Sequence, residues 1–520
     1  MIQILDCTLR DGGYINNWNF TNEQIQKIIT SLEKSHVNVI ECGYLSDKSS
    51  KNKDSTLFSN LKLVENILLP FNSDTQKVLM INHGDFNIYN LPKCNETVID
   101  GIRFAFHKTE LKNALKEAEH IIRLGYKLYF QPMVTKNYTD LEFLSMIEKV
   151  NKLSPYSFYI VDSFGSMTLN EFHKYLILAD SNLAKKIVLG YHSHNNMQLA
   201  FSNAISMCAE NFKRNIIIDA SIYGIGRGAG NLNTELIADF LNKSYEKQYD
   251  TLPLLEIIDE FLNSLMLKNP WGFSPAQFLS ASYNCHPNYA TYLINKNTNH
   301  IVSIKKILEK LPDNVKSSFD KGVIEQLYID SILEEKTPLK GNFSISKNQK
   351  VLLIASGKSV NENIDLITSK TSQRSYIAIA LNHIPKFETD FYFFTNQKRF
   401  DEFSSKINLS KTIITNNIST HKNIFCVLDI KSIAFVNNIL TTNVAIVMLN
   451  HLLLLGFSEV EIAGLDGYNL TLDNYNYEET SAIQDVQELM AQNNLISSSL
   501  EQLAKSIKIN LLTPSIFLKD

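Results

Sequence analysis

The sequence predicts an α/β protein with an N-terminal (β/α)8 TIM barrel, a helical extension and a C-terminal Rossmann-like α/β domain. Three observations predict this organisation. Strand-like and helix-like segments alternate through the first half of the chain, and polar residues follow several of those strands at the same end. A second alternating region begins near Val351. The length of 520 residues is sufficient for two hydrophobic cores.

Strand-like runs of apolar residues define the units of the first half. They are Ile2–Leu5, Val37–Cys42, Lys77–Ile81, Gly101–Phe106, Tyr126–Gln131, Ser157–Asp162, Ile187–His192 and Ile216–Ser221. Segments with helical periodicity lie between them, among them Glu23–Lys34, Glu110–Leu124, Leu141–Leu153 and Leu169–Ala179. Eight such units are the number in a (β/α)8 barrel, although a doubly wound sheet gives a similar pattern.

Polar residues at the strand ends favour the barrel. They are Arg10-Asp11 after the first strand, Glu41-Cys42-Gly43 at the end of the second, Asp162-Ser163 at the end of the sixth, His192 and His194 at the seventh, and Gly224–Asn231 after the eighth. Barrel enzymes build their sites at the carboxyl ends of the strands, from several different loops. These residues are therefore predicted to meet at one mouth of the barrel.

Asp11, His192 and His194 are candidate metal ligands. Strand side chains alternate between the two faces, so the two histidines point the same way. Two imidazoles and one carboxylate suit a divalent metal that keeps open positions. Arg10 would place a permanent positive charge beside them, on a turn made flexible by Gly12-Gly13. The structural alternatives are a hydrogen-bonded histidine pair and a simple Arg10–Asp11 salt bridge.

The segments LDCTLRDGGY (5–14), HSHNN (192–196) and GIGRGAGN (224–231) resemble the DRE-TIM metallolyase superfamily, and within it the 4-hydroxy-2-oxoacid (pyruvate) aldolases. The resemblance covers about residues 1 to 290. It implies that Asp11, His192 and His194 hold Mn²⁺ or Mg²⁺ and that Arg10 binds and stabilises the enolate of pyruvate. The implied reaction makes or cleaves a carbon–carbon bond between a 2-oxoacid and an aldehyde.

At the position expected for proton transfer to the aldol hydroxyl, this sequence departs from the family pattern. The pyruvate aldolases carry a histidine shortly after the Arg-Asp pair, where this chain has Gly13 and Tyr14. Tyr14 is a candidate for proton transfer, directly or through a metal-bound water. The alternative is an unusual carbonyl compound as the acceptor. Asp162, Ser163 and Asn231 are predicted to contact substrate together with Arg10. Alternatively, Asp162-Ser163 caps the next helix, and the glycines near Asn231 form a flexible loop.

Composition excludes several functional classes. The net charge of −4 and the scattered basic residues argue against a nucleic-acid partner. The six cysteines show no CxxC pair and are expected to be reduced thiols. No signal peptide precedes the first strand, and the apolar run Val444–Phe457 is too short to span a membrane. The sequence predicts a cytoplasmic protein that acts on small molecules, and a homo-oligomer is compatible with it.

The predicted domains are the barrel (residues 1–250), the helical extension (251–335), a linker (336–344) and the Rossmann-like domain (345–520). The last begins with an apolar strand that ends at Ser356-Gly357-Lys358-Ser359. This is not a Walker A loop, because the earlier glycine of that motif is missing. The further elements are strands at Tyr376–Ala380, Phe391–Thr395, Thr412–Thr415 and Phe425–Leu428, a helix at Asn443–Leu455 and a strand before Gly464.

This C-terminal part resembles, less closely, bacterial sialyltransferase-like and pterin diphosphokinase-like nucleotide-binding domains. The shared features are the turn at 356–359, Leu381-Asn382 and the segment LGFSEVEIAGLDGY (455–468). The resemblance implies a nucleotide or nucleotide-sugar site, and its candidate residues are Ser356, Gly357, Lys358, Ser359, Asn382 and Asp466. Binding without catalysis, sugar transfer and a purely architectural role all remain open.

Together the two halves predict a divalent-metal-dependent class II aldolase that joins pyruvate, or a related 2-oxoacid, to an aldehyde. A sugar-derived aldehyde in surface-polysaccharide biosynthesis would give the second domain a role. One alternative is a Claisen-type condensing enzyme of the same superfamily that uses an acyl-CoA. Another is a nucleotide-sugar-binding or glycosyltransferase-like protein with an inactive barrel.

Overall fold

A computed structural model describes residues 1–49, 54–68, 75–210, 212–296, 300–469, 474–475 and 486–517. The chain divides into two units. The first consists of Met1–Thr291 and Pro312–Phe319, and the second of Tyr292–Leu311 and Asp320–Asp520. Each unit has its own parallel β-sheet and its own hydrophobic core.

The sheet of the first unit closes into a barrel. Its nine strands follow the order β1-β9-β8-β7-β6-β5-β4-β2-β3, and β1 also pairs with β2. Because β3 (Leu57–Phe58) pairs only at the outer end of this order, the other eight strands form the ring. They are β1 (Ile2–Asp6), β2 (Val39–Leu45), β4 (Gln76–Asn82), β5 (Gly101–Phe106), β6 (Lys127–Pro132), β7 (Ser157–Asp162), β8 (Val188–Ser193) and β9 (Ile216–Ala220). The predicted (β/α)8 barrel is confirmed.

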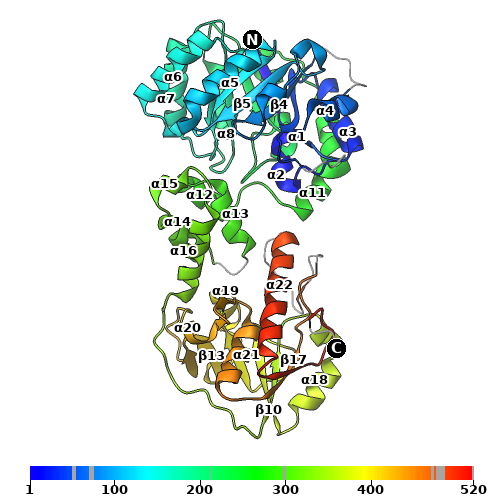
Figure 1. Cartoon of the computed structure of the whole chain (residues 1–520), viewed down its shortest axis with the longest axis vertical. Helices are drawn as coiled ribbons and strands as arrows, with labels where there is room; N and C mark the ends of the chain where they lie inside the picture. Colours follow the sequence, from blue (N-terminus) through cyan, green and yellow to red (C-terminus); the bar gives the residue numbers. More distant parts are fainter. Residues whose placement is uncertain are drawn as a thin grey trace. The chain divides into compact units, whose positions relative to one another are not determined.

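Helices follow the strands and cover the outside of the barrel, as Figure 1 shows for α5, α6 and α7. They are α3 (Asn22–Lys34), α4 (Leu61–Leu68), α5 (Leu111–Arg123), α6 (Asp140–Leu153), α7 (Leu169–Asn182), α8 (Ala200–Ala209) and α9 (Thr234–Tyr245). Thr21, Thr139 and Thr168 each accept a hydrogen bond from the backbone three residues later, in capping boxes that fix where α3, α6 and α7 begin.

The extension after the barrel is helical. It contains α10 (Leu252–Ile257), a π-helical turn (Ile258–Leu262), α11 (Asn263–Lys268), α12 (Pro275–Ser282), α13 (Pro287–Asn295), α14 (Ile301–Glu309), α15 (Asp313–Lys316) and α16 (Lys321–Leu333). Its first part packs on the barrel loops, since Trp271 donates from Nε1 to the carbonyl of Tyr223 at 2.9 Å. The fully buried Asn196 also contacts Gln277 of α12.

The second unit contains a seven-stranded sheet in which every pairing is parallel, in the order β14-β13-β12-β11-β10-β17-β18. The strands are β10 (Lys350–Ile354), β11 (Tyr376–Leu381), β12 (Phe391–Phe394), β13 (Thr412–Thr415), β14 (Cys426–Leu428), β17 (Glu459–Ala463) and β18 (Lys508–Leu511). The helices α21 (Val444–Leu454) and α22 (Val486–Leu503) contribute to its core. The predicted C-terminal α/β domain is confirmed, with β18 as an additional edge strand.

The predicted linker belongs to this second unit. The Lys336 amide donates to the Asn416 carbonyl at 2.8 Å, and Lys340 forms a β-bridge with Val427. Phe343 is 2% exposed and packs into the core. The segment is therefore held along the edge of the sheet. Among the described residues, no helix has the length and apolarity that crossing a membrane requires.

Candidate active site

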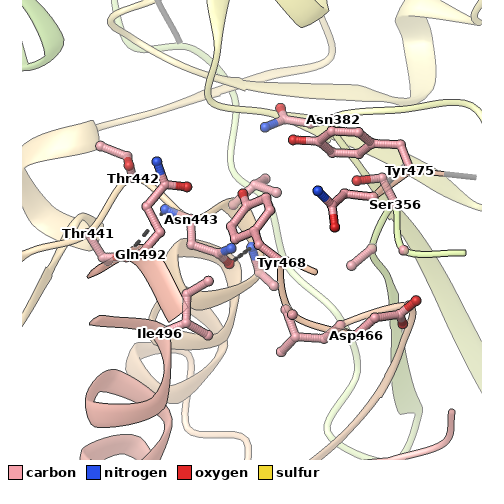
Figure 2. Close-up of a pocket in the computed structure, with 18 of the residues that line it drawn as sticks. Ser356, Asn382, Thr441, Thr442, Asn443, Asp466, Tyr468, Tyr475, Gln492 and Ile496 are labelled. Atoms are coloured by element: carbon pink, nitrogen blue, oxygen red, sulfur yellow. Dashed lines mark hydrogen bonds between the residues drawn. The ribbon is translucent and has the colours of Figure 1, made fainter. Parts of the chain in front are cut away.

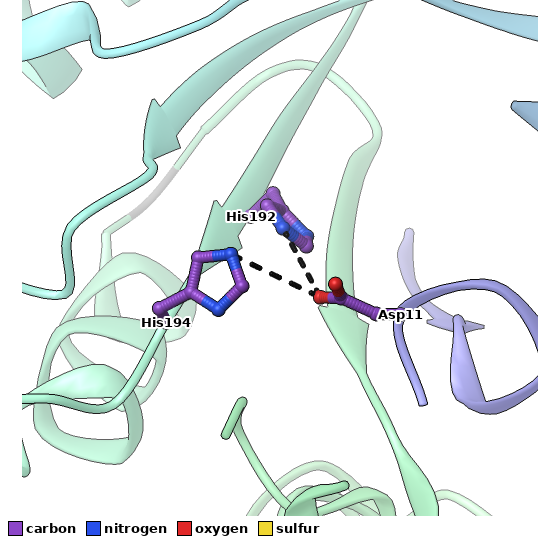
Figure 3. Close-up of side chains that lie close together, drawn as sticks. All are labelled: Asp11, His192 and His194. Carbon is purple, nitrogen blue, oxygen red and sulfur yellow. Dashed lines mark ion pairs between the residues drawn. The ribbon is translucent and has the colours of Figure 1, made fainter. Parts of the chain in front are cut away.

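Three side chains, one after β1 and two at the end of β8, converge at the mouth of the barrel. Asp11 follows β1, and His192 and His194 lie at the end of β8. Asp11 Oδ2 lies 3.8 Å from His192 Nε2 and 3.9 Å from His194 Nε2. Figure 3 shows both imidazoles directed at this carboxylate. One candidate ligand atom from each residue fits within 4.8 Å of the others, a spacing that a single divalent ion can bridge.

Two further residues orient these ligands. His192 Nδ1 lies 3.0 Å from Asp219 Oδ2, so the neutral imidazole carries its proton on Nδ1 and presents the Nε2 lone pair to the site. Asn231 donates from Nδ2 to Asp11 Oδ2 at 2.7 Å, which fixes the carboxylate. Hydrogen bonds of this kind, from a carboxylate or an amide to the ligand side chain, are typical of metal sites, and two imidazoles with one carboxylate fit a divalent cation.

A buried network of charges supports Arg10. Arg10 Nε donates to Glu41 Oε2 at 2.8 Å, and its Nη1 lies 3.0 Å from Asp11 Oδ1. Arg103, which is 0% exposed, donates to the same Glu41 oxygen at 2.6 Å and also to Asp219. The chain of contacts thus runs from Arg10 through Glu41, Arg103 and Asp219 to His192.

The sequence predicted Glu41 at the barrel mouth without a chemical role, and Arg103 and Asp219 were not predicted there. A signal for them exists in the sequence, because each is a single charged residue inside an otherwise apolar strand. Buried charges in proteins are paired, so three such positions in one barrel indicate an internal ion-pair network.

Electrostatics favour the protonation states that metal binding needs. Burial raises the pKa of Asp11, but Arg10, the two histidines and Arg227 outweigh that effect and hold it below its ordinary value. Burial is the main cause that lowers the pKa of His194 to about 3; Arg227, His192 and Arg10 act in the same direction and Asp11 opposes them. Asp11 is therefore ionised and His194 neutral at physiological pH, as ligands of a divalent ion must be.

The prediction that Gly12-Gly13 form a flexible turn is not what the structure shows. The segment forms two short helical turns, α1 (Thr8–Asp11) and α2 (Gly13–Asn16), and Gly12 has an ordinary helical φ of −60°. A Cβ on Gly13 would lie 2.1 Å from the indole of Trp18, which itself donates to the Arg10 carbonyl at 3.0 Å. These glycines therefore serve close packing under Arg10 rather than flexibility.

The other predicted site residues lie around this centre. Tyr14 is 37% exposed, and its ring packs edge-on against Trp18. Asp162 accepts from the amides of Ser166 and Met167 at 3.0 and 2.9 Å, and Ser163 Oγ accepts from the Val134 amide at 2.9 Å. Both side chains thus hold loops in place, and their contact with substrate stays a prediction.

In the second unit, Ser356, Gly357, Asn382 and Asp466 line one pocket (Figure 2). The pocket also contains Asn443, Tyr468, Tyr475 and Gln492. Lys358 and Ser359 are not among its lining residues. Ser359 instead donates from its amide to Asp466 at 2.9 Å and from its hydroxyl to the same carboxylate, which ties the loops after β10 and β17 together.

A family model described as HMGL-like matches residues 1–259. A 4-hydroxy-2-oxovalerate aldolase of Bacillus cereus (strain ATCC 10987 / NRS 248) is 24% identical over 268 residues, which are 51% of this chain and 77% of that protein. A protein of the same name from Thermomicrobium roseum is 27% identical over 274 residues, 52% of this chain and 74% of that one.

A solved structure of a variant carboxyl transferase domain of Rhizobium etli pyruvate carboxylase has a TM-score of 0.50 at 10% identity. It covers 63% of this chain and 61% of that one, and it shows a common fold only. The family match, the closed barrel and the motifs at its mouth agree. Residues 1–259 therefore form an HMGL-like domain of the DRE-TIM type, and the chain is a lyase.

Proposed function

We propose that the barrel is a divalent-metal-dependent aldolase that joins the enolate of pyruvate, or of a related 2-oxoacid, to an aldehyde, or cleaves the product. The observation that carries the proposal is the cluster of Asp11, His192 and His194 beside a buried arginine. Arg10 Nη2 is buried and has no hydrogen-bond partner among the described residues, so it is available to a substrate oxygen. The relatives named 4-hydroxy-2-oxovalerate aldolase support the same reaction class.

A divalent ion, Mn²⁺ or Mg²⁺, held by the three ligands would polarise the carbonyl of the 2-oxoacid. Arg10, fixed by Glu41, places a permanent charge where the enolate oxygen develops. In synthesis the methyl group of pyruvate gives up one proton to a base, and its carbon bonds to the aldehyde carbon as the π bond of the aldehyde carbonyl breaks. The resulting alkoxide then takes up a proton.

Tyr14 is the proposed donor of that last proton. Desolvation raises the pKa of Tyr14, against the lowering effect of Arg227 and Arg10, so it is protonated at neutral pH. Asn231, 2.7 Å from Asp11, is the proposed substrate contact on the opposite loop. Cleavage uses the same groups in reverse.

Exchange of the methyl protons of pyruvate with deuterium tests this chemistry, because enolisation needs no aldehyde. Proton NMR should show exchange that requires Mn²⁺ or Mg²⁺ and that falls at least 100-fold in Arg10→Met and His192→Gln. The exposed Asp140→Asn serves as a control. Metal binding without exchange would overturn the pyruvate assignment, and release of a free thiol from an acyl-CoA would favour the condensing alternative.

The pocket of the second unit carries a separate proposal, a site for a nucleotide or nucleotide-sugar. β10 is the first strand of this sheet, β11 lies on one side of it and β17 on the other, so the strand order reverses here. Ligands of open α/β sheets bind in such crevices. Figure 2 places Ser356, Asn382 and Tyr475 along one side of the pocket and Thr442, Asn443 and Gln492 along the other.

The amides of this pocket favour a ligand rich in acceptor oxygens. Asn382 Oδ1 accepts from the Thr395 amide at 3.1 Å, and Asn443 Oδ1 accepts from the amides that open α21. Their Nδ2 groups are left as donors, while Tyr468 and Tyr475 offer aromatic faces to a base. Calorimetric titration with CMP, UMP and ADP should detect binding that Asn382→Leu weakens at least tenfold. Absence of binding by all three would overturn this proposal.

A nucleotide-linked, sugar-derived aldehyde in surface-polysaccharide biosynthesis would use both units. Under this hypothesis, Asn382→Leu slows aldol addition to nucleotide-linked aldehydes and leaves addition to small aldehydes unchanged. Equal rates of the variant and the wild type on both substrates would refute it.

A further inference from the structure

One cation at the barrel mouth, Arg227, has no carboxylate partner among the residues that the structure describes. Arg227 lies in the loop after β9, and it forms no ion pair with any residue that the structure describes. Its Nε is buried and lacks a hydrogen-bond partner in the same part of the chain. The guanidinium nevertheless lies close enough to Asp11 to contribute to the low pKa of that carboxyl. A cation near the reacting centre without a counter-ion indicates a place for an anionic ligand.

The loop holds Arg227 in a fixed position. A Cβ on Gly226 would lie 2.4 Å from Asn231 Nδ2, and one on Gly228 would lie 2.9 Å from Asn196 Oδ1. Asn196 is 0% exposed and accepts from the Ala229 amide at 2.9 Å. Close packing on both sides of Arg227 therefore fixes the backbone from which its side chain extends.

Two neighbours orient the guanidinium. Its carbon lies 5.3 Å from the ring centre of Tyr14, over the aromatic face. Stacking of this kind leaves the N–H groups at the edge of the guanidinium free to bind oxygen. The second neighbour is His286 of the helical extension, whose Nε2 lies 3.4 Å from Arg227 Nη1.

The contact between Arg227 and His286 brings two donors together. The Asn288 amide donates to His286 Nδ1 at 3.2 Å, so the proton of the neutral imidazole is on Nε2. Burial lowers the pKa of His286, and Arg227 lowers it further, which keeps the ring neutral. In this tautomer Arg227 Nη1 and His286 Nε2 are both donors and lie 3.4 Å apart, so an anionic oxygen that contacts both would accept two hydrogen bonds.

We propose that Arg227 and His286 bind an anionic group, a carboxylate or a phosphate, on the carbonyl acceptor of the aldol reaction. This inference rests on the proposed aldolase function. Arg10 and the metal ligands already account for the carboxylate and keto oxygen of the 2-oxoacid. The acceptor carbonyl must reach Tyr14, the proposed proton donor, and the part of the acceptor beyond it then lies against the guanidinium that covers the Tyr14 ring.

Two four-carbon aldehydes test the proposal, the anionic succinic semialdehyde and the neutral butanal. Their binding to the full-length protein with Mg²⁺ and pyruvate can be measured by ligand-observed NMR, which needs no turnover. We expect the wild type to bind the anionic aldehyde at least tenfold more tightly. Arg227→Met should weaken that binding about 10- to 100-fold, the value of a charge-assisted hydrogen bond, and change butanal binding less than twofold.

Further variants separate the roles of charge and geometry. Arg227→Lys should bind the anionic aldehyde with an affinity between those of the wild type and Arg227→Met, because lysine keeps the charge but lacks the paired N–H donors of the guanidinium. His286→Gln should weaken binding of the anionic aldehyde about 2- to 10-fold, as the loss of a neutral hydrogen bond does. Lys174→Met, at an exposed pair with Asp140, is the control and should change nothing.

Three results would overturn the inference. They are equal binding of the two aldehydes by the wild type, equal losses on both in Arg227→Met, and a rise in the pyruvate concentration needed for deuterium exchange in that variant. The last would place the 2-oxoacid carboxylate at Arg227. Failure of the aldolase function itself is distinguishable, because the wild type would then show no metal-dependent exchange.

Discussion

Replacement of Asp219 by asparagine should weaken metal binding although Asp219 is no ligand. Its Oδ2 lies 3.0 Å from His192 Nδ1 and also accepts from Arg103. Asparagine has nearly the same size, but its single carbonyl oxygen would serve both donors without the negative charge that strengthens these bonds. His192 would then be a less basic and less well oriented ligand.

The expected loss of metal affinity follows from the hydrogen bond between Asp219 and the candidate ligand His192. Removal of such a partner costs about 10- to 100-fold in metal affinity, or about 1.4 to 2.8 kcal/mol. The loss in folding free energy should stay below the roughly 3 to 5 kcal/mol of a broken buried pair. Arg103 keeps its 2.6 Å contact with Glu41 in the variant, so no charge is left without a partner.

Electron paramagnetic resonance of free Mn²⁺ measures the dissociation constant directly. The matched control is Asp140→Asn, which removes an exposed carboxylate paired with Lys174 on the outside of the barrel. Fluorescence of Trp18 and Trp271, both in the barrel unit, reports whether the variant is folded. A folded Asp219→Asn protein that binds Mn²⁺ within twofold of the wild type would refute the reasoning.

Three more predictions follow from individual contacts. Glu41→Gln removes the negative charge that anchors Arg10 at 2.8 Å. The rate of pyruvate deuterium exchange should fall about 10- to 100-fold, while the affinity for Mn²⁺ changes less than threefold. An unchanged exchange rate would contradict this prediction. Burial raises the pKa of Asp162 from 3.8 to about 6 against two backbone hydrogen bonds, so its contribution to stability is complete below pH 3.8 and is lost as the pH rises through about 6. The stability advantage of wild type over Asp162→Asn, from urea unfolding followed by tryptophan fluorescence, should shrink by about 3 kcal/mol between pH 4 and pH 7, and a constant difference would argue against it. Gly357→Ala would place a Cβ 2.4 Å from the Asp466 carboxyl carbon, which should lower the folding stability of the second unit only, by about 1 to 3 kcal/mol. Hydrogen exchange in β10 and β17 should be faster, with unchanged tryptophan fluorescence. Protection from exchange equal to that of the wild type would count against this prediction.

Local patterns in the sequence were sufficient to predict the strands of the barrel and the metal-binding candidates. Strand formation depends on local apolar runs, and β5 (Gly101–Phe106) and β7 (Ser157–Asp162) have the predicted bounds. The candidate ligands were predictable because each lies at the carboxyl end of a strand, and these ends of barrel strands share one mouth.

The pairing of the buried charges depends on how the barrel closes. Arg103 is 62 residues from Glu41 and 116 from Asp219, and these three meet because the ring closes through the pairing of β1 with β2 and β9. No local pattern encodes that closure. The contact of Arg227 with His286 likewise depends on where the helical extension packs, since 59 residues separate them. Periodicity is a property of neighbours in the chain, whereas the electrostatics of a site depend on distances between segments far apart in sequence.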